Sequence, residues 1–343
     1  MASSVYLWSD VSRLRDGASE CFKIIRDVLC PGMVGFKVHF GEEGNKTHVK
    51  PEWLRDAKTI FDRPVFVECN VMYRGSRTRK ADHVATAKRH GFGFIDIDIL
   101  DGEMGEASME VPVNVGRTKA AKLGAGLEKY DRLVSVSHFK GHMATGFGGV
   151  LKNIGMGLGS RGGKMDMHSI ISPIVNGAKC VACGTCVADC PVGAITLGDV
   201  AAIDSGKCVG CAHCIAVCPR GALDIPWNMS NEVNNVLMEK IAEYALAAVR
   251  GRRWWHMNFI TDLTYDCDCM GTDQKPFMKD IGIVLSDDPV ACDQAAFDLV
   301  KERSNGKDPF LKKHEIDGTH ILEYAEKIGL GKRAYALKPV SRS

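Results

Sequence analysis

The run CVACGTCVADCP at residues 180–191 decides the organisation of this 343-residue chain, because it recurs as CVGCAHCIAVCP at residues 208–219. Both copies have the spacing Cys-x2-Cys-x2-Cys-x3-Cys-Pro. Three thiolates at this spacing can hold three corners of an iron–sulfur cubane, and the fourth, before proline, serves the other cluster. The pattern predicts two 4Fe-4S clusters, one on Cys180, Cys183, Cys186 and Cys218 and the second on Cys208, Cys211, Cys214 and Cys190.

Zinc is the alternative ligand for such cysteines, since Cys-x2-Cys pairs also form zinc sites. A zinc site does not need a triplet with a displaced Cys-Pro, and it does not need that unit twice. The segment from Ala178 to Pro226 resembles a bacterial two-cluster ferredoxin. That resemblance implies low-potential one-electron transfer, with a donor or acceptor protein as partner. We therefore expect residues 177–226 to form an α+β ferredoxin-like lobe.

Apolar strand-like runs alternate with helical patterns on both sides of this lobe. Strands are predicted at 34–40, 64–69, 92–100, 132–139, 257–263 and 281–285, and helices at 51–62, 81–90, 119–129, 231–249, 289–300 and 320–328. This alternation is typical of α/β proteins with a parallel sheet. We predict a discontinuous α/β domain, residues 1–176 and 227–343, with a mostly parallel sheet core into which the lobe is inserted.

The segment SHFKGHMATGFGGVLKNIGMGLGSRGGKMDMH, residues 137–168, combines glycines with basic side chains directly after a predicted strand. Ligands of parallel sheets bind beyond the carboxyl ends of strands, and glycines let backbone amides approach an anion. The segment matches neither a phosphate-binding loop nor a dinucleotide fingerprint. It predicts a pocket for an anionic small molecule. The candidate catalytic residues are His138, His142, Lys152, Lys164 and His168, and the candidate binding residues are Lys140, Gly148, Gly149 and Asn153.

The chemistry of this segment stays open at the level of sequence. His138 and His142 have metal-ligand spacing if the segment is helical, but the glycines favour a loop. Lysines that share a pocket would repel one another, and burial would add to this, so their pKa values would fall. An isolated histidine would more simply be a surface or capping residue.

Two further groups could form the wall of this pocket. Asp266, Cys267, Asp268 and Cys269 would alternate between two faces if the preceding strand continued. In a loop they could converge on a cation or a substrate, and in a plain turn the aspartates would be solvated and the cysteines inert. Arg74 and Arg77 follow another predicted strand and would be either solvated or part of the pocket. We expect only packing roles for Cys21, Cys30, Cys69 and Cys292.

Several motifs together resemble the domain of unknown function 362 family, iron–sulfur centre proteins with an inserted ferredoxin unit. They are His39-Phe-Gly-Glu-x-Gly-Asn45, Asn70-x2-Tyr-Arg-Gly-x-Arg77, Gly146-Phe-Gly-Gly-x-Leu-Lys-Asn-x-Gly-Met-Gly157 and Asp266–Cys269. The resemblance implies an α/β core and clusters but no particular reaction. His142, Lys152 and His168 are also similar to a pattern of the lactate racemase family. That similarity implies a nickel-pincer cofactor anchored on Lys152, although the racemase family has no ferredoxin insert.

Composition excludes some partners. The net charge of +2 gives no broad basic field for nucleic acid or anionic lipid. No signal peptide and no apolar run of about 20 residues is present, so we expect no membrane partner and a cytoplasmic location. In a reducing compartment, cysteines are more often metal ligands or redox thiols than disulfides.

The leading functional hypothesis is an iron–sulfur oxidoreductase that passes low-potential electrons through the two clusters to an anionic small molecule. The alternatives are a non-enzymatic electron-transfer or assembly protein, and a metal- or nickel-pincer-dependent isomerase with accessory clusters. The oligomeric state cannot be predicted.

Overall fold

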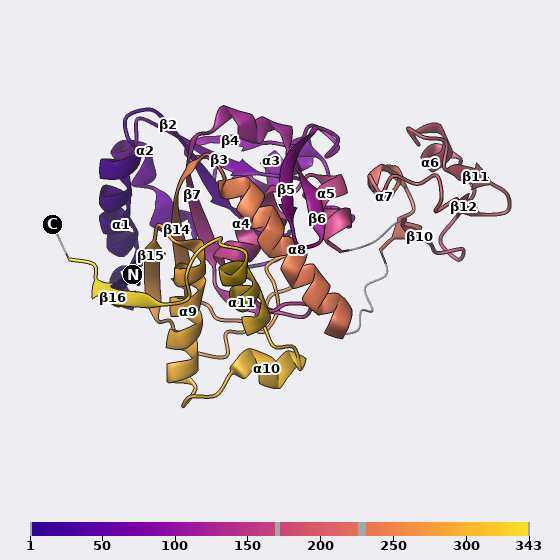
Figure 1. Ribbon diagram of the computed structural model, residues 1–343. Helices are drawn as coiled ribbons and strands as arrows, with labels where there is room; N and C mark the ends of the chain where they lie inside the picture. The colour runs from indigo at the N-terminus through magenta and orange to yellow at the C-terminus, as the bar shows by residue number, and fades with distance from the viewer. Residues whose placement is uncertain (1, 169–171, 226–230, 342–343) are drawn as a thin grey trace.

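The computed structural model describes residues 2–168, 172–225 and 231–341, and an eight-stranded sheet forms its centre (Figure 1). The strands in sheet order are β16 (Tyr335–Pro339), β1 (Ser3–Trp8), β15 (Gly282–Ser286), β14 (Arg253–Ile260), β7 (Arg132–His138), β2 (Met33–Val38), β3 (Arg63–Glu68) and β4 (Asp96–Ile99). From β14 to β4 all neighbours are parallel, and only β15 runs antiparallel to its neighbours. The predicted α/β class with a mostly parallel sheet is therefore confirmed.

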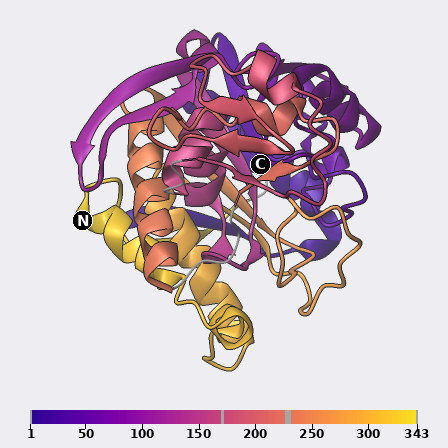
Figure 2. The ribbon, with the colours of Figure 1, turned by 90° about the vertical axis from the view of Figure 1, so that its right-hand side faces the viewer.

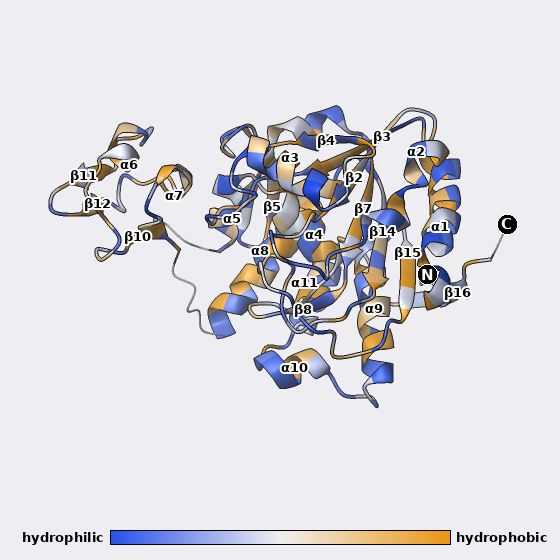
Figure 3. Cartoon of the chain, turned by 180° about the vertical axis from the view of Figure 1, so that it is seen from behind, coloured by the Kyte–Doolittle hydropathy of each residue, from blue (hydrophilic) through white to orange (hydrophobic). Residues whose placement is uncertain are grey.

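Helices cover both faces of the sheet, because its strands are apolar on both sides. In β14, Met257 and Phe259 join one buried cluster and Trp254 and Ile260 join the other. The first cluster packs under α1 (Leu14–Leu29), α2 (Ala57–Ile60) and α3 (Lys80–Arg89). The second packs under α4 (Val150–Leu158), α8 (Asn231–Val249), α9 (Pro289–Arg303) and α11 (Thr319–Lys327). Figure 3 shows the orange strands between helices that carry the blue hydrophilic residues.

The chain reverses its direction of progress across the sheet between β2 and β7. It runs outward from β2 to β3 and β4 and then returns to place β7 on the other side of β2. Such a switch point leaves a crevice at the carboxyl ends of the two strands, where ligands of open α/β sheets bind. Residues that follow β2 and β7 are therefore the natural place for a site.

Several local predictions differ from the structure. Residues 119–129, predicted as a helix, form β6 (Thr118–Gly124) and a 3-10 helix (Ala125–Lys129). The alanines and lysines of β6 favour a helix locally, but pairing with β5 (Ser108–Val115) and the burial of Ala121 and Leu123 prevail. The predicted helix at 51–62 is divided into a 3-10 turn (Pro51–Leu54) and α2, and the strand predicted at 92–100 is only β4.

The segment 137–168 is mostly regular structure rather than a loop. It forms the hairpin β8 (Lys140–His142) and β9 (Gly146–Gly148), then α4 and α5 (Arg161–Met167). Two short helices, at Val11–Arg13 (3-10) and α10 (Pro309–His314), complete the α/β part. No helix among the described residues is both long and apolar enough to cross a bilayer.

The cysteine-rich segment forms a separate lobe beside the sheet, at the right of Figure 1 and facing the viewer in Figure 2. Its ends meet where β10 (Ile174–Val175) pairs with β13 (Leu223–Asp224), and β11 (Ile195–Leu197) pairs with β12 (Ala201–Ile203). The short helices α6 (Thr185–Ala188) and α7 (His213–Val217) complete it. A third buried cluster includes Ile195, Ile215 and Leu223 of the lobe, together with Met72 and Met165 of the α/β part.

Candidate functional site

A cavity of about 270 Å³ lies at the carboxyl ends of β2, β3 and β7. Lys37 and His39 reach it from β2, Glu68 and Cys69 from β3, and His138 from β7. The loop after β14 adds Cys267 and Cys269, while α4 and α5 lie along another side. The cavity therefore occupies the crevice that the switch point between β2 and β7 creates.

Most of the residues proposed from the sequence meet in this cavity. It is lined by Arg77, His138, Lys140, His142, Lys152, Asn153, Lys164, His168, Cys267 and Cys269. Five proposed residues do not line it. Arg74 instead lies beside Gly221 of the lobe, Asp268 is buried behind the cavity wall, and Asp266, Gly148 and Gly149 lie outside the lining.

The glycines of this region allow close packing. A side chain at Gly155 would come within 2.2 Å of the carbonyl of Ile241 in α8. A side chain at Gly157 would come within 2.5 Å of Lys37 Nζ, and one at Gly149 within 2.3 Å of Asp293 Oδ1. The glycines thus let α4 lie against α8 and against the buried charges of the sheet.

Asp293 sets the start of α4 and so positions Lys152. Its carboxylate accepts hydrogen bonds from the backbone N–H groups of Val150, at 2.6 Å, and Leu151, at 2.8 Å. It also accepts one from Asn258 Nδ2 at 2.7 Å. Two of the N–H groups that a helix start leaves without partners are thereby satisfied from another helix. Lys152 lies one residue further along, in the first turn.

A buried ion pair lies at the floor of the cavity. Lys37 Nζ is 2.9 Å from Glu68 Oε1, and both side chains are nearly inaccessible to solvent. Lys37 also donates to Asn153 Oδ1 at 2.7 Å, and Asn153 Nδ2 donates to the carbonyls of Lys37 and Val136. Burial lowers the pKa of Lys37, although Glu68 opposes this. Asn153 therefore connects α4 to β2 and β7 at the switch point.

The other lysines differ in how they are held. Lys140 donates to the carbonyl of His138 at 3.0 Å and lies 3.7 Å from Asp268 Oδ2. Burial favours a lower pKa for Lys140, but Asp268 and Cys267 raise it overall, contrary to the expectation from crowded lysines. Lys164 donates to the carbonyls of Gly157 and Gly159 at the end of α4. For Lys152 we find no hydrogen bond or ion pair with any residue that the structure describes.

Residues 266–269 do not continue a strand, since β14 ends at Ile260 and the four residues lie in a loop. Asp268 is fully buried and lies 2.9 Å from His138 Nδ1, so it is not a solvated aspartate. Burial opposes its ionisation, but His138 and Lys140 lower its pKa overall. With Asp268 held behind the wall, the thiols of Cys267 and Cys269 line the cavity on the other side.

The two thiols lie beside His142. The backbone N–H of Cys269 donates to Cys267 Sγ at 3.4 Å, and a ligand atom of His142 lies within 4.8 Å of both sulfurs. This geometry can hold a metal ion. A hydrogen bond from the Cys269 thiol lowers the pKa of Cys267, which burial opposes and Lys152 and His142 reinforce. Burial and Lys152 lower the pKa of His142 to about 4.

Sequence reasoning missed several residues of the cavity. Lys37 and Glu68 are charged residues within apolar strands, which is a pattern that could have been noticed. Cys69, expected only to pack, also lines the cavity, as do His39 and Tyr73. Arg77 lines it too, but its guanidinium is bound to Glu42, at 3.2 Å, and to the hydroxyl of Tyr73.

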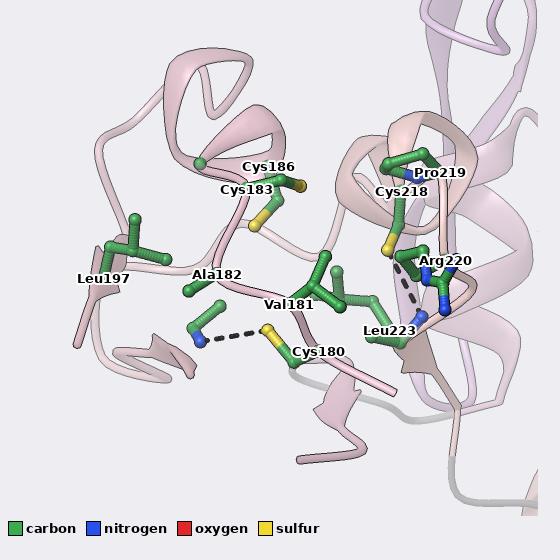
Figure 4. Close-up of a pocket in the computed structure, with 13 residues that line it drawn as sticks. Cys180, Val181, Ala182, Cys183, Cys186, Leu197, Cys218, Pro219, Arg220 and Leu223 are labelled. Atoms are coloured by element: carbon green, nitrogen blue, oxygen red, sulfur yellow. Dashed lines mark hydrogen bonds between the residues drawn. The ribbon is translucent and has the colours of Figure 1, made fainter. Parts of the chain in front are cut away.

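In the lobe, Cys180, Cys183, Cys186 and Cys218 surround one small space (Figure 4). The dashed lines in Figure 4 mark backbone N–H groups that donate to sulfur, from Ala201 to Cys180 at 3.4 Å and from Ala222 to Cys218 at 3.2 Å. The structure therefore brings the fourth cysteine of the second motif to the first three of the first motif. This is the grouping that the sequence predicts.

The two motifs have the same backbone form. Ala182 and Gly210, at the same place in each motif, have φ of 50° and 64°, and Gly184 and Ala212 have φ of 77° and 54°. Left-handed residues at both positions turn the loop so that its cysteines face inward. Among the described residues, no three of the eight cysteines have sulfurs within 4.8 Å of one another. Sulfurs around one tetrahedral zinc ion are about 3.8 Å apart, as Zn–S bonds of about 2.3 Å require.

The second cysteine set lies against the α/β part. A side chain at Gly162, in α5, would come within 3.8 Å of the Cα atom of Cys211. Burial and the nearby Cys211 and Cys208 raise the pKa of Cys214 to about 12. Cys190 accepts a hydrogen bond from the backbone N–H of Ala194 at 3.3 Å. Helix α5 therefore touches this set at its first turn and lines the cavity with Lys164.

Comparison with known proteins gives family membership and a distant likeness. No curated protein matches the chain significantly. The crystal structure of a protein from Thermotoga maritima is similar over 85% of this chain, with 11% identity and a TM-score of 0.40, and the chain covers 58% of that protein. The model of the family described as "Domain of unknown function (DUF362)" matches residues 34–298. The chain therefore belongs to the DUF362 family.

Proposed function

We propose that this protein is an iron–sulfur oxidoreductase. Two 4Fe-4S clusters in the lobe would pass low-potential electrons to an anionic small molecule in the cavity. The observation that carries the proposal is the position of α5, which contacts the second cysteine set through Gly162 and lines the cavity through Lys164. An electron carrier alone would need no buried cationic cavity next to its cysteines.

The cysteine sets suit clusters better than single ions. Among the described residues, the motif cysteines form no group of three sulfurs as close together as one tetrahedral zinc ion holds them, and backbone N–H groups donate to Cys180, Cys190 and Cys218. Hydrogen bonds to cluster sulfurs stabilise the negative charge of a cubane and tune its reduction potential. When bound, the clusters would supply electrons one at a time.

The charges in the cavity suit an anion. Lys37 is paired with Glu68, Arg77 with Glu42, and Lys140 with Asp268, so these three cations are locally balanced. Lys152 and Lys164 have no carboxylate partner among the described residues. Lys164 already donates to helix carbonyls, which leaves the Lys152 ammonium to bind a carboxylate or phosphate.

Two histidines of the cavity, His142 and His168, are neutral at physiological pH. Burial lowers the pKa of His168 to about 3, and that of His142 is lowered to about 4. Neutral imidazoles are hydrogen-bond donors as well as acceptors. His142 and His168 would therefore orient an anion held by Lys152 without adding to the positive charge.

Re-oxidation of reduced protein tests the proposal. Protein reduced with dithionite and freed of excess reductant is mixed anaerobically with a panel of small carboxylates and phosphates, and cluster absorption near 400 nm is followed. We expect at least one anion to re-oxidise the wild type and Lys152→Ala to react at least ten-fold more slowly at equal iron content, since charged hydrogen bonds contribute about 1.5–3 kcal/mol. Lys307→Ala, at an exposed lysine, is the matched control.

The result would instead support a non-enzymatic carrier if no small molecule re-oxidised the clusters while a partner protein did so, taking one electron per cluster. Equal rates for Lys152→Ala and wild type would also contradict the proposed role of the cavity.

The isomerase remains a second candidate because His142, Lys152 and His168 do meet in one cavity. Burial, and after it Lys152, lowers the pKa of both histidines. Intact-mass and elemental analysis of protein from cells able to make the nickel cofactor separates the candidates. A mass adduct on Lys152 with one nickel per chain would favour the isomerase, and its absence favours the oxidoreductase.

A further inference from the structure

We propose that Cys267 and Cys269 form a redox-active dithiol in the cavity wall, which reduces a small anionic disulfide. This inference deepens the proposed function and rests on it for the supply of electrons. Both thiols line the cavity, and their sulfurs lie within 4.8 Å of each other. The intervening Asp268 is fixed behind the wall by His138, so the loop presents both thiols to one side.

The two thiols have different environments, as an attacking and a resolving thiol require. Cys267 receives hydrogen bonds from the backbone N–H and the thiol of Cys269, and Lys152 and His142 also stabilise its thiolate. The pKa of Cys267 is low for these reasons. The hydrogen bond with Cys267, together with burial, raises the pKa of Cys269 well above its usual value. Because its sulfur accepts the backbone N–H, we assign Cys267 as the attacking thiolate and Cys269 as the resolving thiol.

The same three residues could hold a cation, but their surroundings oppose it. Lys140 and Lys152 act electrostatically on Cys267, and two ammonium groups that stabilise a thiolate also repel a divalent ion. The backbone N–H of Ala144 donates to His142 Nδ1 at 3.1 Å, so the proton of the neutral ring is on Nε2. Histidines that bind metals almost always donate from their other nitrogen. His142 instead accepts a hydrogen bond at Nδ1, so its Nε2–H can donate to a thiolate.

Other cysteines outside the lobe show the contrast. Burial raises the pKa of Cys21 to about 12 and that of Cys292 well above its usual value. Neither lines the cavity, and the Cys292 thiol donates to the backbone carbonyls of His256 and Val284. Such thiols are inert. The dithiol is thus distinguished by its environment and not only by its spacing.

The reaction balances with the electrons of two clusters. The Cys267 thiolate attacks one sulfur of the substrate disulfide, forms a mixed disulfide and releases the first substrate thiolate. Cys269 loses its proton to solvent, attacks Cys267 Sγ and releases the second thiolate, which leaves a Cys267–Cys269 disulfide. Two electrons, delivered one at a time from the reduced lobe, and one proton restore the thiolate and thiol. In the net reaction, one substrate disulfide takes up two electrons and becomes two thiolates.

Trapping the intermediates in the cluster-containing protein tests this step. Anaerobic protein is treated with 3,3′-dithiodipropionate, a dianion, or with cystamine, a dication, and then quenched, alkylated and digested for mass spectrometry. We expect a Cys267–Cys269 disulfide in the wild type, formed at least ten-fold faster with the dianion. Cys269→Ser should stop at a mercaptopropionate adduct on Cys267, and Cys30→Ser, at a cysteine remote from the cavity, should behave as wild type.

Two further measurements separate this inference from the proposed function. In pre-reduced protein the dianion should re-oxidise the clusters in the wild type and not in Cys267→Ser. Folded, iron-loaded protein that forms neither the disulfide nor the adduct would overturn the dithiol alone. One zinc, nickel or cobalt ion per chain that is lost in Cys267→Ser would overturn it in favour of a metal site. Iron-free protein that still forms the disulfide would support the dithiol and contradict the clusters.

Discussion

The crossed grouping of the cysteines can be tested with two double variants that differ in one residue. Cys180 and Cys218 line the same space in the lobe, whereas Cys190 lies outside it. Because each cubane needs four thiolates and holds four irons, the wild type should contain about eight irons per chain. Cys180→Ser with Cys218→Ser removes two ligands of one cluster and should leave about four irons. Cys180→Ser with Cys190→Ser removes one ligand from each cluster and should leave almost none.

Iron and acid-labile sulfide per chain, measured in anaerobically purified protein, give the result directly. Circular dichroism checks that the α/β part stays folded, which we expect because the buried clusters on the two faces of its sheet contain no residue of the lobe. Cys30→Ser, outside the lobe, should keep all eight irons. The opposite pattern, with the Cys180/Cys190 pair keeping four irons and the Cys180/Cys218 pair keeping none, would refute the crossed grouping in favour of one motif per cluster.

Three further predictions concern the α/β part. Lys37→Met leaves Glu68 buried without its partner and should lower the free energy of unfolding by about 3–5 kcal/mol in urea titrations, while adding Glu68→Gln should recover most of the loss. Asp293→Ala leaves the N–H groups of Val150 and Leu151 without an acceptor and removes one hydrogen bond of Asn258 Nδ2, so it should lower the free energy of unfolding by at least about 2 kcal/mol. A loss below about 0.5 kcal/mol would contradict the capping role. Because His168 has a pKa of about 3 when folded and about 6.5 when unfolded, its contribution to stability is full above about pH 6.5 and is lost as pH falls toward 3. Between pH 6 and 4, the free energy of unfolding of the wild type, from thermal unfolding, should fall by about 1.4 kcal/mol per pH unit more than that of His168→Gln. The same pH dependence in both proteins would count against a neutral His168.

The sequence predicts best what depends on neighbouring residues or on a general rule of α/β sheets. The cysteine spacing groups Cys180, Cys183, Cys186 and Cys218, and the structure places these four together. The lysines and histidines of the segment 137–168 meet in one cavity because that segment follows β7, and ligands bind at the carboxyl ends of parallel strands.

Features that depend on tertiary contacts were harder to predict. The glycines of 137–168 suggested a loop, yet Val150–Leu158 is a helix in which Gly155 gives room to the backbone of α8. Lys37 and Glu68 are far apart in sequence, and their pairing appears only when β2 and β3 lie side by side. The orientation of the Cys267 and Cys269 thiols toward the cavity likewise depends on His138, which is distant in sequence and holds Asp268.

The metal content of anaerobically purified protein tests the central claim most directly. Elemental analysis with an assay for acid-labile sulfide should give about eight irons and eight sulfides per chain, with broad absorption near 400 nm that bleaches on reduction. Zinc bound to the eight cysteines of the lobe, without labile sulfide, would contradict the account.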